Sequence, residues 1–184
     1  MKVAILHEGT EDNALITKLI TTLELDLGRV EFYRMGSKSN FFTEDHKDYR
    51  ELIQLIRADQ IVRVLFVVDA DFQKNDQVYG GYANTLSALK KLVVDFDIVD
   101  ISQFYICCDP STQEGNVESL LLATLDKEKK TCIDDFLACS DFNAKNNSKA
   151  ILNGIYNIAY PEPPYNFKHE YFNELKEKLR ILLS

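Results

Sequence analysis

Acidic residues follow two apolar stretches of the chain, and their side chains are the ones best suited to chemistry. Glu8 and Gly9 follow the stretch KVAILH, and Asp69 and Asp71 follow VRVLFVV. Side chains at alternate positions of an extended chain point the same way, so Asp69 and Asp71 can face one ion. Carboxylate oxygens without His or Cys are typical ligands of Mg²⁺ or Mn²⁺. Such an ion bridges a phosphate and stabilises the charge that develops there.

These carboxylates need a scaffold that brings the ends of two distant strands together. Short apolar runs bounded by turn residues predict four strands, over 2–7, 30–35, 62–68 and 101–107. Helical spacing between them predicts an α/β fold with a four-stranded parallel sheet flanked by helices. Ligands bind such sheets beyond the carboxyl ends of the strands, where both acidic motifs would lie.

The segments between and after the strands predict helices. Apolar residues at helical spacing from Ile16 to Leu27 predict a helix that Gly28 ends. Four further helices are expected after the last strand, over 117–125, 131–139, 150–158 and 171–183. We therefore expect an α/β core over 1–125 and a helical C-terminal extension over 126–184, packed on the core as one compact unit.

The two acidic motifs resemble the signature of the Toprim domain, the metal-binding module shared by topoisomerases, bacterial primases and OLD nucleases. The Glu-Gly of that signature corresponds to AILHEG, and its Asp-x-Asp corresponds to VLFVVDAD. The resemblance implies that Glu8 acts as general acid or base and that Asp69 and Asp71 hold Mg²⁺. Many Toprim proteins place a glycine soon after Asp-x-Asp, whereas this chain reads DADFQKNDQVYGG.

Further segments resemble small standalone Toprim-like proteins related to the OLD nucleases. They are GSK, ending at Lys38, and PSTQEGNVE, ending at Glu118, with weaker matches at 149–150 and 169–172. The resemblance implies that Glu118 is a further metal ligand; an acid at a helix N-terminus also simply stabilises the helix. Lys38, beside Gly-Ser, is suited to hold a phosphate, and a solvated loop lysine is the alternative.

Two residues after the first strand complete the set of candidate phosphate- or substrate-binding residues. Gly9 and Asp12 join Lys38 in that set, because they follow the strand that carries Glu8. Asp12 and its neighbour Glu11 lie in the first turn of the following helix. Acids there also stabilise the helix by interacting with its dipole, which is the alternative role of Asp12.

Charge and composition narrow the classes of partner. The 184 residues include 21 Lys and Arg against 29 Asp and Glu, a net charge of −8. This balance argues against coating nucleic acid with positive charge, but a bound cation reverses the sign of an acidic site. We expect nucleic acid, DNA or RNA, to bind weakly without metal, with a basic protein partner as a further possibility. The chain is expected to be a monomer or a homodimer.

The remaining composition excludes other classes. Four cysteines and three histidines show no spacing suited to zinc, and reduced thiols fit a cytoplasmic protein. The start, MKVAILHEGTED, does not resemble a signal peptide, and no run of about 20 apolar residues could span a bilayer. We therefore expect a cytoplasmic protein that is not bound to membrane.

The leading hypothesis is a Mg²⁺-dependent enzyme that acts on phosphodiester bonds of nucleic acid, most simply a nuclease. One alternative is a non-catalytic Toprim-like module that binds metal and nucleotide or a protein. Another is a nucleotide-sugar transferase that uses Asp-x-Asp, although Glu8-Gly9 has no place there. A response-regulator receiver also places acids after its first and third strands, but it does not need Asp71.

Overall fold

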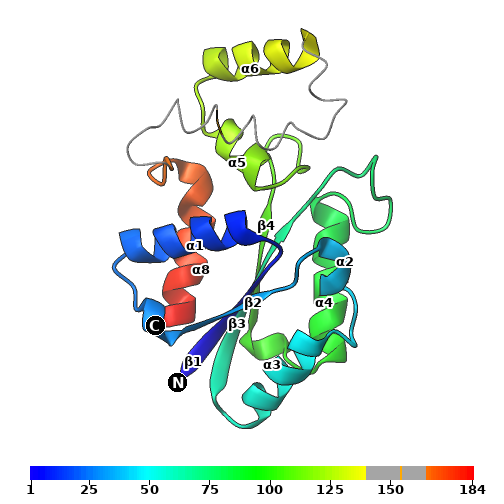
Figure 1. Ribbon diagram of the computed structural model, residues 1–184, viewed down its shortest axis with the longest axis vertical. Coiled ribbons are helices and arrows are strands. Elements are labelled where there is room, and N and C mark those ends of the chain that lie inside the picture. The colour runs from blue at the N-terminus through cyan, green and yellow to red at the C-terminus, as the bar shows by residue number, and fades with distance from the viewer. Residues whose placement is uncertain (140–153, 155–164) are drawn as a thin grey trace.

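The computed structural model describes residues 1–139, 154 and 165–184 (Figure 1). Its centre is a sheet of four parallel strands in the order β2-β1-β3-β4. The strands are β1 Lys2–His7, β2 Val30–Arg34, β3 Ile61–Asp69 and β4 Ser102–Cys107. The predicted α/β fold with a four-stranded parallel sheet is confirmed.

Helices cover both faces of this sheet. Those described are α1 Thr10–Thr22, α2 Lys38–Phe41, α3 Lys47–Arg57, α4 Tyr82–Asp95, α5 Val117–Ala123, α6 Lys127–Cys139 and α8 Asn173–Leu183. In Figure 1, α1 and α8 lie on one side of the sheet, and α3 and α4 lie on the other. Short 3₁₀ turns precede β2, β4 and α8, at Leu27–Arg29, Val99–Ile101 and Glu170–Phe172.

Alternate side chains of the strands supply two separate apolar layers. In β1, Val3 and Ile5 pack with α1, α5 and α8, whereas Ala4 and Leu6 pack with α3 and α4. All four side chains are fully buried. A strand buried on both faces needs apolar residues at successive positions, which is why residues 3–6 of β1 lack the polar alternation of a half-exposed strand.

The connections place a topological switch point between β1 and β3. The chain leaves β1 through α1 on one face toward β2, and it leaves β3 through α4 on the other face toward β4. Strands β1 and β3 are neighbours, and His7 pairs with Val67 near their carboxyl ends. A switch point of this kind opens a crevice at the carboxyl edge of the sheet, where ligands bind.

The first helix ends earlier than Gly28, and this prediction was wrong. Helix α1 ends at Thr22, because Glu24 adopts a left-handed conformation with φ 56°. The amide of Leu25 then bonds the carbonyl of Ile20 at 3.1 Å, and that of Glu24 bonds Thr21, which is a Schellman ending. Helices α3 and α4 end in the same way at Asp59 and Asp97, so acidic residues take the position that glycine usually fills.

The C-terminal helix, α8, packs in the apolar layer that contains Val3, Ile5 and α1. Leucines of α8 are buried in the cluster that contains β1 and α1, and two arginines bind the carbonyls at its end. The Nη1 of Arg29 donates to the carbonyl of Leu183 at 2.7 Å, and that of Arg63 donates to the carbonyl of Ile181 at 2.8 Å. These contacts attach part of the predicted extension to the core.

Other predicted helices differ in their bounds. The helix expected over 117–125 ends at Ala123, and that expected over 131–139 begins at Lys127. The helix expected over 150–158 lies, apart from residue 154, outside the described residues, as does the pair at 149–150. Within the described ranges, no helix has the length and apolar character needed to cross a bilayer. The four cysteines are free thiols, buried at Cys107 and Cys108.

Candidate functional site

Glu8 lies directly after β1, and its carboxylate reaches the end of β3. The main-chain amide of Asp69 donates a hydrogen bond of 3.1 Å to Glu8 Oε1. On the opposite side, the amide of Gly36 donates to the carbonyl of Glu8 at 2.9 Å, continuing the pairing of β1 with β2. Glu8 is therefore held from both neighbouring strands, at the switch point of the sheet.

The surroundings of Glu8 favour its protonated form. Burial, then the negative charge of Asp71, raises the pKa of Glu8 to about 7, and the charge of Asp12 acts in the same direction. The hydrogen bond from the Asp69 amide and the charge of Lys38 lower this pKa, but they do not compensate for the rest. A carboxyl group of this kind exchanges a proton readily near neutral pH.

Asp71 lies outside the strand, so its position does not follow from strand alternation. Its backbone is left-handed, with φ 57°, and it forms an isolated antiparallel bridge with Gly115. The Asp71 amide donates to the Gly115 carbonyl at 2.6 Å, and the Gly115 amide donates back at 3.1 Å. Gly115 has φ 102°, and a Cβ atom there would lie 2.2 Å from Ser119 Oγ. Only glycine fits at this contact.

Asp69 connects the end of β3 to helix α5. Its Oδ1 accepts a hydrogen bond of 3.1 Å from the main-chain amide of Val117, the first residue of α5. The side chain is buried, with 7% of its surface exposed. Burial raises the pKa of the neighbouring Cys107 thiol, and the charges of Asp69, Asp12 and Glu8 raise it further. Three of the predicted site residues therefore lie around the end of β4.

Glu118 follows Val117 in the first turn of α5. Its side chain is almost entirely buried, with 2% exposed. The helix is capped by Asn116, whose Oδ1 accepts from the amide of Ser119 at 3.1 Å. Glu118 lies in the first turn, where an acid also stabilises the helix, and its predicted role as a metal ligand stays a prediction.

Lys38 is not a solvated loop lysine. It is the first residue of α2, with only 7% of its surface exposed, and Ser37 precedes it in an extended conformation. Its ammonium donates a hydrogen bond to the carbonyl of Ala70 and lies 3.5 Å from Asp71 Oδ2. The positive charge predicted to hold a phosphate thus lies beside the second aspartate of the Asp-x-Asp motif.

Gly9 and Asp12 form the start of helix α1. Asp12 Oδ2 accepts a hydrogen bond of 2.7 Å from the Gly9 amide, and Asp12 is 6% exposed. The helix-stabilising role predicted as the alternative for Asp12 is therefore present. Its charge nevertheless acts on Glu8, whose pKa it raises. The structure gathers Glu8, Asp12, Lys38 and Asp71 in one electrostatic neighbourhood.

The described residues contain no group of three or more His, Cys, Asp or Glu side chains arranged to hold a metal ion. Mg²⁺ commonly needs fewer protein ligands, since one or two carboxylates, water and substrate phosphates complete its shell. The predicted pair, Asp69 and Asp71, corresponds in number and type to such a set, and its role in holding a metal stays a prediction. The negative charge of Asp71 raises the pKa of Glu8, because the two carboxylates repel each other. A bound cation would reduce that repulsion.

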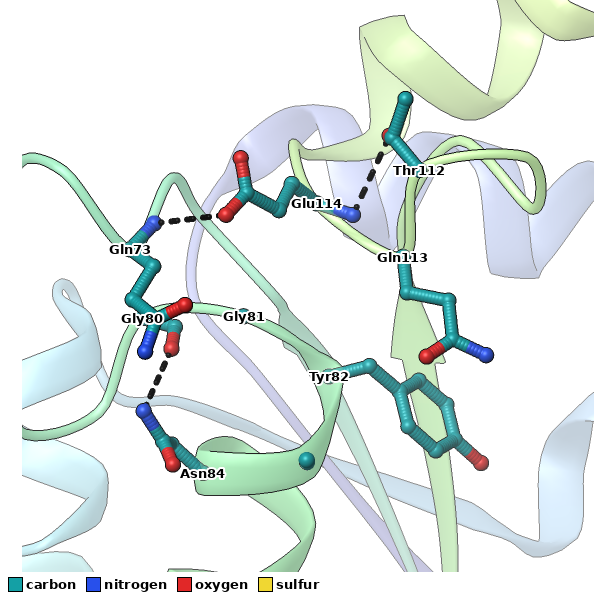
Figure 2. Close-up of a pocket in the computed structure, with 9 residues that line it drawn as sticks. Gln73, Gly80, Gly81, Tyr82, Asn84, Thr112, Gln113 and Glu114 are labelled. Atoms are coloured by element: carbon teal, nitrogen blue, oxygen red, sulfur yellow. Dashed lines mark hydrogen bonds between the residues drawn. The ribbon is translucent and has the colours of Figure 1, made fainter.

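Glu8, Asp12, Asp69 and Asp71 are called the acidic group below. A polar pocket adjoins the acidic group, and the sequence analysis missed it. Its volume is about 150 Å³, and it lies between the segments that follow β3 and β4 (Figure 2). The lining residues are Gln73, Gly80, Gly81, Tyr82, Ala83, Asn84, Thr112, Gln113 and Glu114. The signal available in the sequence was the long segment DADFQKNDQVYGG between the third strand and the next helix.

The acidic group and the pocket together form the candidate functional site at the carboxyl edge of the sheet. Glu8 and Asp69 share a hydrogen bond, Asp71 and Lys38 are 3.5 Å apart, and Glu118 follows in α5. Comparison with protein-family models, with curated proteins and with solved structures returned no match.

Proposed function

We propose that this protein is a metal-dependent phosphodiester hydrolase that cleaves nucleic acid, a Toprim-like nuclease. One observation carries the proposal: at the switch point of the sheet, the Glu8 carboxylate accepts a hydrogen bond of 3.1 Å from the Asp69 amide, which brings the Glu-Gly and Asp-x-Asp motifs together. Without a bound metal, burial and the charge of Asp71 raise the pKa of Glu8 to about 7, and a carboxyl group with a raised pKa is suited to general acid–base catalysis.

Each side chain has a defined role in this proposal. Asp69 and Asp71 hold Mg²⁺ or Mn²⁺, which supplies Lewis-acid stabilisation of the phosphate when bound. Glu8 accepts the proton of the attacking water or returns a proton to the leaving oxygen. The ammonium of Lys38, already beside Asp71, faces the same phosphate and balances its charge. Glu118 supports the metal shell from α5.

The net charge of −8 shapes how a nucleic acid is held. A phosphate backbone is repelled by the surface as a whole, so binding depends on the metal and on local contacts. Nucleic acid is thus expected to bind weakly in a chelator and more tightly with Mn²⁺. A basic protein partner that brings the substrate to the site is compatible with the same charge.

Cleavage assays with single-stranded DNA, double-stranded DNA and RNA test the proposal. With Mg²⁺ or Mn²⁺ we expect cleavage that a chelator abolishes. The change Glu8→Gln is expected to lower the rate by about 100-fold or more, as for a lost general acid–base group. Asp71→Asn is expected to lower the rate because it removes a metal ligand. The matched control is Glu11→Gln, which changes an exposed carboxylate in the first turn of α1 and should leave cleavage unchanged. Full activity in Glu8→Gln would contradict the proposal.

A non-catalytic module is the second candidate, and Lys38 favours it. An ammonium beside Asp71 and on the Ala70 carbonyl neutralises part of the site without any metal. A protein that binds a nucleotide phosphate through Lys38 would then need no turnover. Nucleotide binding in a chelator, together with no cleavage under any metal condition, would favour this module over the nuclease.

A further inference from the structure

The polar pocket is bounded by two loops that are joined to each other. The segment 72–81 follows β3, and the segment 109–115 follows β4. The amide of Gln73 donates to Glu114 Oε1 at 3.3 Å, and that of Tyr82 donates to the carbonyl of Gln113 at 2.9 Å. Gly81, with φ 84°, donates to the Ala70 carbonyl at 2.9 Å. The walls are therefore preformed, which lowers the cost of ordering them on binding.

The pocket lies next to the acidic group. Gln73 comes two residues after Asp71, and Glu114 immediately precedes Gly115, which is bridged to Asp71. Gly80 closes the turn so tightly that a Cβ atom there would lie 2.3 Å from the Asp76 carbonyl. A ligand group in the pocket would thus adjoin a phosphate held at Asp71.

The lining chemistry suits a neutral group rich in hydrogen-bonding atoms. Three carboxamides line the pocket, those of Gln73, Asn84 and Gln113, and Figure 2 shows them around the cavity. The side-chain amide of Asn84 donates to the Gly80 carbonyl at 2.9 Å, which leaves its oxygen to accept. The described lining residues include no Lys or Arg, so a bare phosphate has no cationic partner here.

The remaining lining residues indicate which chemical group the pocket would bind. Tyr82 supplies an aromatic ring beside Gln113, and Glu114 supplies a carboxylate acceptor (Figure 2). Carboxamides pair with the edge of adenine through two hydrogen bonds, and carboxylates accept from the amino group of cytosine. A volume of about 150 Å³ holds a single ring system, since pockets for larger ligands occupy roughly 300–1,000 Å³.

We propose that this pocket binds one unpaired nucleobase of the substrate strand with an amino group at C6 or C4, that is, adenine or cytosine. The amino group donates to Glu114, the carboxamides of Gln73 and Gln113 bond the ring nitrogens and, in cytosine, the O2 carbonyl, and Tyr82 packs on the base. The inference rests on the proposed function, because it assigns the base that adjoins the phosphate at Asp71.

Nucleoside binding without metal tests this inference separately from cleavage. NMR titrations of the full chain with adenosine, cytidine and uridine in a chelator should show adenosine and cytidine binding about tenfold tighter than uridine. The changes Gln113→Leu and Gln73→Leu should each weaken adenosine binding about tenfold. Gln54→Leu, an exposed glutamine of α3, is the matched control and should bind adenosine normally.

A conservative change separates selectivity from folding. Glu114→Gln keeps an oxygen for the Gln73 amide but loses the charge, so it should fold and bind uridine as tightly as adenosine. Equal affinity of the wild-type chain for the three nucleosides, no binding of any, or normal adenosine binding by Gln113→Leu would overturn the inference. Because no metal is present, these outcomes are independent of whether the protein cleaves nucleic acid.

Discussion

The ammonium of Lys38 lies 3.5 Å from Asp71 Oδ2, joining the start of α2 to the loop after β3. Lys38 also donates to the carbonyl of Ala70, and it is almost completely buried. A buried ammonium is costly unless it is paired. The site therefore contains its own counter-ion, which partly offsets the repulsion among its carboxylates.

Removing that counter-ion should destabilise the fold. Lys38→Met keeps the apolar stem but loses the charged hydrogen bond, so the free energy of unfolding should fall by about 1–3 kcal/mol. Lys2→Met is the matched control, because Lys2 pairs with Glu31 at the surface and exposed pairs contribute about 0–1 kcal/mol. Urea denaturation measures both. Equal losses in the two variants would show that the Lys38 contact adds nothing.

Glu8 should make stability depend on pH in a defined window. Its pKa in the folded chain is raised to about 7, whereas a carboxyl group of an unfolded chain titrates near about 4.3. The folded state binds the proton more tightly than the unfolded state. The contribution of Glu8 to stability is therefore fully present below the unfolded pKa of about 4.3 and is lost as pH rises toward about 7. Glu8→Gln should remove this loss. Parallel pH profiles of the two chains in urea denaturation would contradict it.

Asp109 should show the opposite dependence. Burial alone would raise its pKa, but hydrogen bonds from Lys130, at 2.5 Å, and from Ser111 outweigh it and hold the pKa of Asp109 below its usual value. Its contribution is thus present above the unfolded value of about 3.9 and disappears as pH falls below it. The stability difference between wild type and Asp109→Asn should shrink on acidification. A difference that stays constant with pH would exclude the ion pair as its source.

Gly115 should resist substitution. Its φ of 102° and the 2.2 Å approach of Ser119 Oγ leave no room for a methyl group. Gly115→Ala should cost about 1–3 kcal/mol of unfolding free energy and should displace Asp71, its bridge partner. Denaturation and a metal titration measure the two effects. Wild-type stability together with wild-type metal affinity would show that this bridge does not position Asp71.

The sequence was sufficient for the sheet because buried strands require continuous apolar runs. KVAILH and VRVLFVV therefore marked β1 and β3, and parallel order followed from their alternation with helices. Helix ends were less predictable, because Glu24, Asp59 and Asp97 end helices in a left-handed conformation that glycine usually takes.

The candidate site was only partly predictable. Glu8 and Asp69 follow buried strands, so their meeting at the sheet edge could be expected. The position of Asp71 depends on a bridge to Gly115, and the burial of Lys38 depends on the Ala70 carbonyl. Contacts between distant loops have no periodic signal in the sequence. The same reason accounts for the pocket, whose walls meet through Tyr82 and Gln113.

The central claim is that Asp69 and Asp71 hold a divalent cation next to Glu8. Paramagnetic broadening of assigned amide NMR signals during titration with Mn²⁺ tests it most directly. The account predicts broadening centred on Glu8, Asp69 and Asp71 that competes with Mg²⁺ and weakens about tenfold or more in Asp71→Asn. Broadening centred elsewhere on the described surface, or unchanged in Asp71→Asn, would contradict it.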